Sequence, residues 1–166
     1  MRLFVAVEIP MEIRERIAKL GEEIRQDGIV SVKPENMHLT LKFIGEGNPD
    51  EIIEKLAAVR FSRFRCRAKN VGVFPNENYI RVVWAGIEGT EELAEKVQES
   101  LGEKERFTGH ATIARVKRKV DLGAFLEKHR DDEFGEFEVS GFQLIKSELG
   151  PGGPAYTTLA TFEADG

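Results

Sequence analysis

Hydrophobic and polar residues follow two different periods along the chain, and segments of the two kinds alternate over most of its length. Apolar runs and apolar–polar alternation predict strands, whereas apolar positions three or four apart predict helices. Strands are expected at residues 2–8, 29–33, 37–44, 64–74, 79–87, 110–116, 137–146 and 155–162. Helices are expected in the intervals that follow residues 10, 48, 90 and 121. No obvious linker divides the chain, so residues 1–166 are predicted to form a single domain.

The predicted helices begin at residues that commonly start helices. Pro10 opens the first helix. That helix has an apolar stripe made of Ile13, Ile17, Leu20 and Ile24. Asn48 is a favourable N-cap, and Pro49 fits the first helical position that follows it. Thr90 and Asp121 are the predicted caps of the third and fourth helices.

The order of the predicted elements is the same in the two halves of the chain. In each half a strand and a helix lead to a strand that begins near a histidine, and a helix and a further strand follow. The matched segments are 2–8 with 79–87, 38–41 with 110–113, and 71–74 with 140–143. A unit used twice in this way usually forms two lobes related by a pseudo-twofold axis. Residues at matching positions are then expected to face each other across a cleft.

The cysteine content and the hydrophobic runs limit the cellular compartments in which the protein is expected. Cys66 is the one cysteine, which excludes an internal disulfide and a cysteine-rich zinc site and fits a reducing cytosol. The apolar run at residues 3–7 is too short for a signal-peptide core. The longest uncharged stretch, residues 149–162, is broken by prolines and glycines, so it cannot be a membrane helix. The protein is therefore predicted to be cytoplasmic and to have no membrane partner.

Charge is distributed unevenly along a chain whose net charge is −5. Residues 55–76 contain six basic side chains and no acidic one, and residues 106–120 contain five and none. Such segregation suits a protein that grips an anionic ligand locally. Within the first segment, basic and apolar residues alternate over residues 63–69, which predicts a strand with a basic face. That face could equally be solvated or paired with acidic helices.

Two of the three histidines begin the pattern His-x-Thr-x, at His38 and His110. Residues i and i+2 of a strand share a face, so His38 and Thr40 are predicted to point the same way, as are His110 and Thr112. A lone strand histidine more often has a structural role, but two at equivalent positions of a repeat favour a functional one. The third, His129, lies near a predicted helix C-terminus and is expected to be structural.

Two imidazoles that face each other suit phosphodiester chemistry. A neutral ring can take the proton of an attacking oxygen while an imidazolium protonates the leaving oxygen. Histidine is the side chain whose ordinary pKa lets both forms coexist near neutrality. Threonine hydroxyls can donate to the non-bridging phosphate oxygens as charge develops there. Carboxylates do not cluster at metal-ligand spacings around either motif, and the glycine-rich nucleotide loops are missing, so no metal or cofactor is expected.

With both motifs in a duplicated chain, the sequence resembles the 2H phosphoesterase superfamily, and within it the RNA 2′,3′-cyclic phosphodiesterases, or 2′-5′ RNA ligases. The resemblance covers nearly the whole chain, and its segments are residues 2–7, 35–45, 72–75, 83–86, 109–115 and 147–156. It implies an α+β fold of two pseudo-symmetric lobes. Each lobe would be a mainly antiparallel sheet with helices on the outer face, and the active-site cleft would lie between the sheets.

The resemblance also implies the catalytic set and the reaction. His38 would be the proton donor and His110 the proton acceptor, with Thr40 and Thr112 beside them. The residues alone do not decide which histidine is the donor and which the acceptor, because the repeat is nearly symmetric. The implied reaction is a metal-independent opening of an RNA 2′,3′-cyclic phosphate by water to a 2′-phosphomonoester. With a 5′-hydroxyl RNA end in place of water, a 2′-5′ linkage would form without ATP. The implied partners are RNA ends, tRNA halves among them, and no obligate protein partner is predicted.

Four further residues are candidates for substrate binding. Lys42 is an even number of residues from His38 and Thr40 in the same predicted strand. It is therefore expected on their face and could reach phosphate. Arg115 fits the family pattern after the second motif, but its parity places it on the other face unless the strand bulges. Phe74 and Tyr156 are candidate stacking platforms for bases, with core packing as the alternative role.

Two other functions remain open at this point. The same chemistry could act on small cyclic nucleotides or on 2′-5′-linked oligonucleotides, in which case the rate would depend little on salt. Alternatively, the chain could be a non-catalytic RNA-binding module whose basic strand binds the RNA backbone while the histidines are incidental.

Overall fold

A computed structural model describes residues 2–166 of the chain. This range contains nine strands, four α-helices and one short 3₁₀ helix. In chain order they are β1 (Arg2–Val7), α1 (Met11–Glu23), β2 (Ile29–Ser31), η1 (Pro34–Asn36), β3 (Leu39–Glu46), α2 (Pro49–Leu56), β4 (Phe64–Asn76), β5 (Tyr79–Glu88), α3 (Glu91–Ser100), β6 (His110–Val116), α4 (Gly123–His129), β7 (Glu133–Val139), β8 (Gly141–Gly150) and β9 (Gly153–Glu163).

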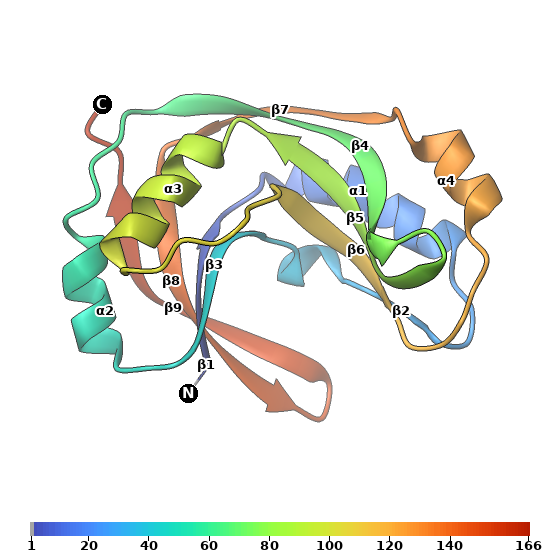
Figure 1. The fold of residues 1–166 in the computed structure, drawn as a ribbon, viewed down its shortest axis with the longest axis horizontal. Helices are drawn as coiled ribbons and strands as arrows, with labels where there is room; N and C mark the ends of the chain where they lie inside the picture. Colours follow the sequence, from blue (N-terminus) through green and yellow to red (C-terminus); the bar gives the residue numbers. More distant parts are fainter. Residues whose placement is uncertain (1) are drawn as a thin grey trace.

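The strands form a curled antiparallel sheet in the order β7-β4-β5-β6-β3-β1-β8-β9, with β2 added to β6 (Figure 1). Within the described residues β3 and β6 are register partners at one position only, Leu39 with Ala111. This narrow seam joins two sheet halves, β7-β4-β5-β6 and β3-β1-β8-β9. The predicted α+β fold with antiparallel sheets is confirmed. The two sheets are continuous through the seam, which sequence patterns did not indicate.

Each sheet half contains strands from both halves of the sequence. β4 follows the first motif in the chain but pairs with β5, and β8 follows the second motif but pairs with β1. The helices cross over as well, since α1 packs against β6 and β7 while α3 packs against β3. The two sheet halves are therefore tied together by helices and by exchanged strands as well as by the seam.

One predicted strand, at residues 137–146, is wrong, because the structure divides it into β7 and β8 at Ser140. β7 pairs with β4, whereas β8 pairs with β1 and β9 on the far side of the sheet. The buried positions show the cause. Phe137 and Val139 alternate with exposed residues, but the next buried residue, Phe142, is out of phase with them. A strand cannot bury both sets on one face without a break.

The helices start close to the predicted residues, but not every predicted cap residue acts as a cap. The Asn48 side chain accepts a hydrogen bond from the Asp50 backbone N–H at 2.9 Å, as expected of a cap. Thr90 precedes α3, but its hydroxyl is buried and has no hydrogen-bond partner in the part of the chain described. Before α4 the N-cap is Leu122 instead of Asp121, whose carboxylate accepts from the Gly123 N–H at 2.9 Å.

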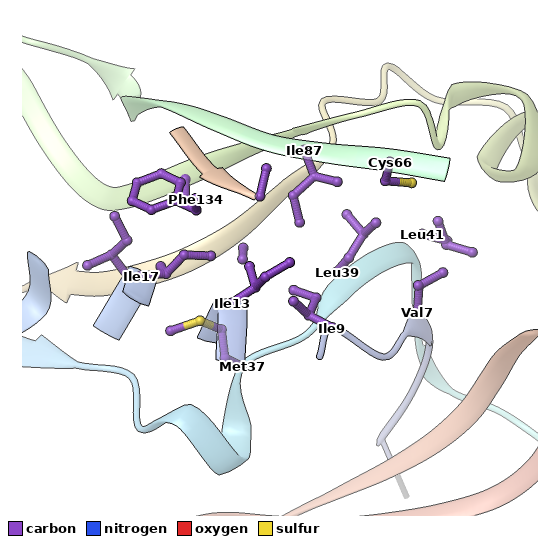
Figure 2. Close-up of a cluster of buried hydrophobic side chains, with 14 of the residues drawn as sticks. Val7, Ile9, Ile13, Ile17, Met37, Leu39, Leu41, Cys66, Ile87 and Phe134 are labelled. Carbon is purple, nitrogen blue, oxygen red and sulfur yellow. The ribbon is translucent and has the colours of Figure 1, made fainter. Parts of the chain in front are cut away.

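One hydrophobic core serves both sheet halves. Figure 2 shows side chains of β1, α1, β3, β4 and β5 meeting in this core, among them Val7, Ile13, Leu39, Cys66 and Ile87. Each fully buried aliphatic side chain contributes about 1.5–3 kcal/mol relative to an exposed one, so the shared core opposes separation of the halves. Burial also raises the pKa of the Cys66 thiol to about 12. No helix in residues 2–166 is long and apolar enough to cross a membrane.

Candidate active site

The seam between β3 and β6 brings the two His-x-Thr-x motifs together. Its register partners, Leu39 and Ala111, each directly follow a histidine, and both are fully buried on the core face. Successive side chains of a strand point to opposite faces, so the neighbours of this pair point away from the core. The burial pattern agrees, since His38 and His110 are partly exposed beside their buried neighbours. Both histidines therefore lie on one face of the sheet, next to the seam.

The two threonines share this face. Thr40 and Thr112 are partly exposed and follow the buried Leu39 and Ala111. Because β3 and β6 run antiparallel, Thr40 lies on the side of His110 and Thr112 on the side of His38. The structure thus brings two imidazoles and two hydroxyls to one place on the sheet, with the helices and the core on the opposite face.

A cleft of about 710 Å³ opens on this face. His38, Thr40 and Thr112 line it, together with Arg115 and Tyr156. His110 is not itself among the lining residues, but it stands two residues before Thr112 on the same face of β6, next to the cleft. The cleft size falls within the range of about 300–1,000 Å³ that is usual for ligand sites.

Both imidazole rings are oriented by the same kind of hydrogen bond. Nδ1 of His38 lies 3.1 Å from the carbonyl oxygen of Asn36, and Nδ1 of His110 lies 2.7 Å from that of Thr108. A carbonyl oxygen can only accept, so Nδ1 of each ring carries the proton. In the neutral ring Nε2 is then the free acceptor, and it becomes a donor when the ring is protonated. Each histidine is thus prepared to exchange a proton through Nε2.

Burial lowers the pKa of both histidines. Desolvation is the larger cause in each case, and the hydrogen bond to the backbone carbonyl opposes it. The positive charge of Arg14 lowers the pKa of His38 further, and that of Arg115 does so for His110. Glu8 acts in the opposite direction on His38. The neutral form of both rings is therefore favoured near pH 7.

An irregularity in β6 turns Arg115 into the cleft. Thr112 pairs with Trp84 and Ala114 pairs with Val83, so β6 has one extra residue between two adjacent residues of β5. Such a bulge reverses the alternation of the residues that follow it. Arg115 consequently shares the face of Thr112 and lines the cleft, as predicted on the condition that the strand bulges.

A matching irregularity in β3 turns Lys42 away from the cleft. Thr40 pairs with Ala6 and Lys42 pairs with Val5, so β3 also has one extra residue. Lys42 is only 6% exposed, and its Nζ lies 2.9 Å from Glu103 and 3.1 Å from Glu105. The expectation that Lys42 shares a face with His38 is wrong for this reason. Burial lowers its pKa, but the hydrogen bonds to the two glutamates outweigh burial and raise the pKa overall.

Phe43 lies on the cleft face, where unbroken strand alternation would have placed Lys42. It pairs with Phe4 of β1, as Arg115 pairs with Val82 of β5, so Phe43 and Arg115 are equivalent residues of two bulged strands. Phe43 lines the cleft and remains 52% exposed. Phe43 was not among the predicted site residues, although it precedes Arg115 by the same interval that separates His38 from His110.

The two aromatic candidates have different positions. Tyr156 lines the cleft and meets the His38 ring edge-on, at 5.4 Å between ring centroids. Phe74 does not line the cleft; its ring packs edge-on against His110 at 5.1 Å between centroids and, tilted by 39°, against Trp84 at 5.2 Å. Tyr156 can therefore contact a ligand, whereas Phe74 supports the ring of His110.

The basic alternation at residues 63–69 is matched by acidic residues on the neighbouring strand. β4 pairs with the edge strand β7, and Arg63 and Arg67 each lie 3.5 Å from a glutamate of β7, Glu138 and Glu136 respectively. These ion pairs are exposed and stabilise the fold weakly. They nevertheless pair two of the four basic side chains, Arg63 and Arg67, of the face that the sequence suggested for RNA.

The third histidine has the structural role expected of it. His129 ends α4, with Nδ1 2.5 Å from Asp132 and Nε2 2.7 Å from Glu23 of α1. It thereby ties α4 to α1. Across residues 2–166 there is no group of three or more His, Cys, Asp or Glu side chains that could hold a metal ion.

Known proteins resemble this chain over its whole length. The sequence profile of a family described as "LigT like Phosphoesterase" matches residues 7–84. The RNA 2′,3′-cyclic phosphodiesterase of Methanocaldococcus jannaschii is 41% identical over 170 residues, which cover 96% of this chain and 98% of that protein. The chain belongs to the LigT-like phosphoesterase family. The predicted resemblance to 2H phosphoesterases is therefore confirmed.

Two further proteins resemble the chain, one in sequence and one in both sequence and fold. The RNA 2′,3′-cyclic phosphodiesterase of Archaeoglobus fulgidus is 39% identical over 176 residues, covering 98% of this chain and 100% of that protein. The crystal structure of TT0787 of Thermus thermophilus superposes with a TM-score of 0.84 at 34% identity, and covers 100% of this chain and 99% of that one. The fold described above is thus that of the family.

Proposed function

We propose that this LigT-like phosphoesterase hydrolyses RNA 2′,3′-cyclic phosphodiester ends to 2′-phosphomonoesters by two-histidine acid–base catalysis, without a metal. The names of the full-length relatives support the substrate. The single observation that carries the mechanism is the seam, where the pairing of Leu39 with Ala111 brings both motifs to one face. The cleft on that face has room for a nucleotide.

In the proposed reaction His110 is the proton acceptor and His38 the proton donor. Nε2 of neutral His110 removes a proton from water as the water oxygen bonds to phosphorus. The bond from phosphorus to O3′ breaks, and His38, present as imidazolium, donates its Nε2 proton to O3′. The phosphate stays on O2′, so the product is a 2′-phosphomonoester with a free 3′-hydroxyl. Proton exchange with solvent then restores both rings.

The assignment of donor and acceptor follows the resemblance to 2H phosphoesterases, because burial lowers the pKa of both rings alike. Glu8 favours the protonated form of His38, but the larger effect of Arg14 favours its neutral form, and Arg115 favours the neutral form of His110. The hydroxyls of Thr40 and Thr112 would donate to the non-bridging oxygens, and Arg115 would neutralise charge that develops there. With a 5′-hydroxyl RNA end in place of water, the same proton exchange would form a 2′-5′ linkage.

We further propose that residues 1–166 are one domain of two repeat-related lobes. The equivalent pairings of β3 with β1 and of β6 with β5, each with one extra residue after the threonine, support the repeat. They make Ala6 equivalent to Trp84, because these two residues are the partners of Thr40 and Thr112. The buried free thiol of Cys66 is consistent with the cytoplasmic location predicted from the sequence.

The decisive experiment uses an oligoribonucleotide that ends in a 2′,3′-cyclic phosphate, incubated with the protein in EDTA. The expected product carries a 2′-phosphate, which ³¹P NMR or isomer-specific chromatography distinguishes from the 3′-phosphate. A 3′-phosphate product, or turnover that requires an added metal ion, would contradict the proposal. Addition of a 5′-hydroxyl RNA tests the joining reaction in the same mixture.

A further inference from the structure

The cleft is lined by cations and by no acidic side chain of the described residues. Arg2, Lys33, Arg115 and Lys117 all line it, whereas no Asp or Glu within residues 2–166 does so. The net charge of the whole protein, in contrast, is −5. An anion that enters the cleft meets no carboxylate on its wall, so the lining favours a ligand with several negative charges.

Two of these cations, Lys33 and Lys117, belong to neighbouring segments of the chain, and neither has an acidic partner among the described residues. Lys33 follows the edge strand β2, and Lys117 follows β6, to which β2 is paired. No carboxylate of residues 2–166 forms an ion pair with either lysine. The next residue, Arg118, does have an acidic partner, because its Nη1 lies 2.6 Å from Oδ2 of Asp27. Arg118 also does not line the cleft.

Exposed apolar residues line the same cleft. Val30 of β2 is 50% exposed, and Leu149, near the tip of the hairpin formed by β8 and β9, is 86% exposed. This hairpin extends beyond the rest of its sheet half (Figure 1). An aliphatic side chain that is exposed beside unpaired cations offers a contact for the flat, weakly polar face of a base or for a ribose.

We propose that this part of the cleft is a subsite for the nucleotide that precedes the cyclic end. Lys33 and Lys117 bind the phosphodiester that links this nucleotide to the terminal one, and Val30 and Leu149 contact its base or ribose. The inference rests on the proposed function, because the terminal cyclic phosphate must lie between His38 and His110. It makes an oligonucleotide, and not a cyclic mononucleotide, the preferred substrate.

The test compares cytidine 2′,3′-cyclic phosphate with a dinucleotide that ends in the same cyclic nucleotide. In the unmodified protein the dinucleotide is expected to have the higher kcat/KM. Each of Lys33→Ala and Lys117→Ala should lower the dinucleotide-to-mononucleotide ratio roughly two- to fivefold, the range for solvent-accessible charge contacts. The slope of log(kcat/KM) against log salt should be steeper for the dinucleotide by about 0.7, the value for one neutralised phosphate of a single strand.

Arg118→Ala is the matched control, because it removes the same charge from the neighbouring residue outside the cleft. It is expected to leave the ratio unchanged. Equal kcat/KM for the two substrates, or an equal effect of Lys117→Ala and Arg118→Ala, would overturn the subsite. If neither substrate is turned over, the proposed function fails. The subsite is then judged by calorimetric titration with cytidine 2′-phosphate and with the dinucleotide ending in 2′-phosphate, where equal affinities would overturn it.

Discussion

His38 and His110 are oriented by equivalent hydrogen bonds, each from Nδ1 to the backbone carbonyl oxygen two residues earlier in the chain. The acceptors belong to Asn36, at the end of η1, and to Thr108, in the loop before β6. Each ring is thereby held with Nε2 free. Since a backbone carbonyl accepts each of these hydrogen bonds, the orientation of the rings depends on the loops before β3 and β6.

Replacement of either histidine is expected to abolish most of the activity. His38→Ala and His110→Ala should each lower kcat/KM on a cyclic-ended oligonucleotide at least about a hundredfold, the lower range for a general acid or base. His129→Gln is the control, because it removes the remaining histidine from a site that joins α4 to α1. It should lower Tm but keep kcat/KM. Full activity in His38→Ala or in His110→Ala would exclude the mechanism.

The pH dependence follows from the lowered pKa of both rings. Activity needs His38 protonated and His110 neutral, so kcat/KM should give a bell-shaped profile whose maximum lies below the ordinary histidine pKa of about 6.5. Its alkaline limb is the loss of the His38 proton, and its acid limb is the protonation of His110. Arg115 lowers the pKa of His110, so Arg115→Ala should raise that pKa and move the acid limb to higher pH. An acid limb that stays in place or moves to lower pH would contradict the assignment.

Lys42 is expected to affect stability more than substrate binding. Lys42→Met keeps the aliphatic chain but removes the ion pairs with Glu103 and Glu105. The free energy of unfolding should fall by only about 1 kcal/mol, because both glutamates are largely exposed and water screens the pairs. Urea denaturation measures this change. The salt dependence of KM should stay as in the unmodified protein, whereas a lysine that bound phosphate would make it shallower.

Gly72 is a position at which a single methyl group should disturb the site. A Cβ at Gly72 would lie 2.3 Å from Cζ2 of Trp84, and the indole ring is 6.2 Å from that of His110 between centroids. Gly72→Ala should therefore displace Trp84, destabilise the fold by about 1–3 kcal/mol and lower activity. Gly150→Ala is the comparison, because the nearest atom to its Cβ would be at an ordinary 3.5 Å. Equal Tm values for the two variants would show that Trp84 is not constrained.

Sequence periodicity alone determined most helices and strands and the His-x-Thr-x pairs. These features are local: a strand alternates every two residues, and so His38 with Thr40, and His110 with Thr112, share a face whatever their partners are. The failure at residues 137–146 was also local in origin, because the apolar residues change phase at Ser140. The change of phase is visible in the sequence, because Phe142 is an odd number of residues from Phe137 and Val139.

Tertiary structure decided which residues reach the cleft beyond those pairs. Lys42 and Arg115 exchanged the faces that parity assigned to them, because β3 and β6 each have one residue more than the neighbouring strand. A bulge is a property of two paired strands, so one strand's sequence does not reveal it. The meeting of the motifs at Leu39 and Ala111 likewise depends on the pairing of segments far apart in the chain. Local alternation sets the direction of a side chain only as far as the next bulge, whereas strand pairing decides where the bulges lie and which side chains become neighbours.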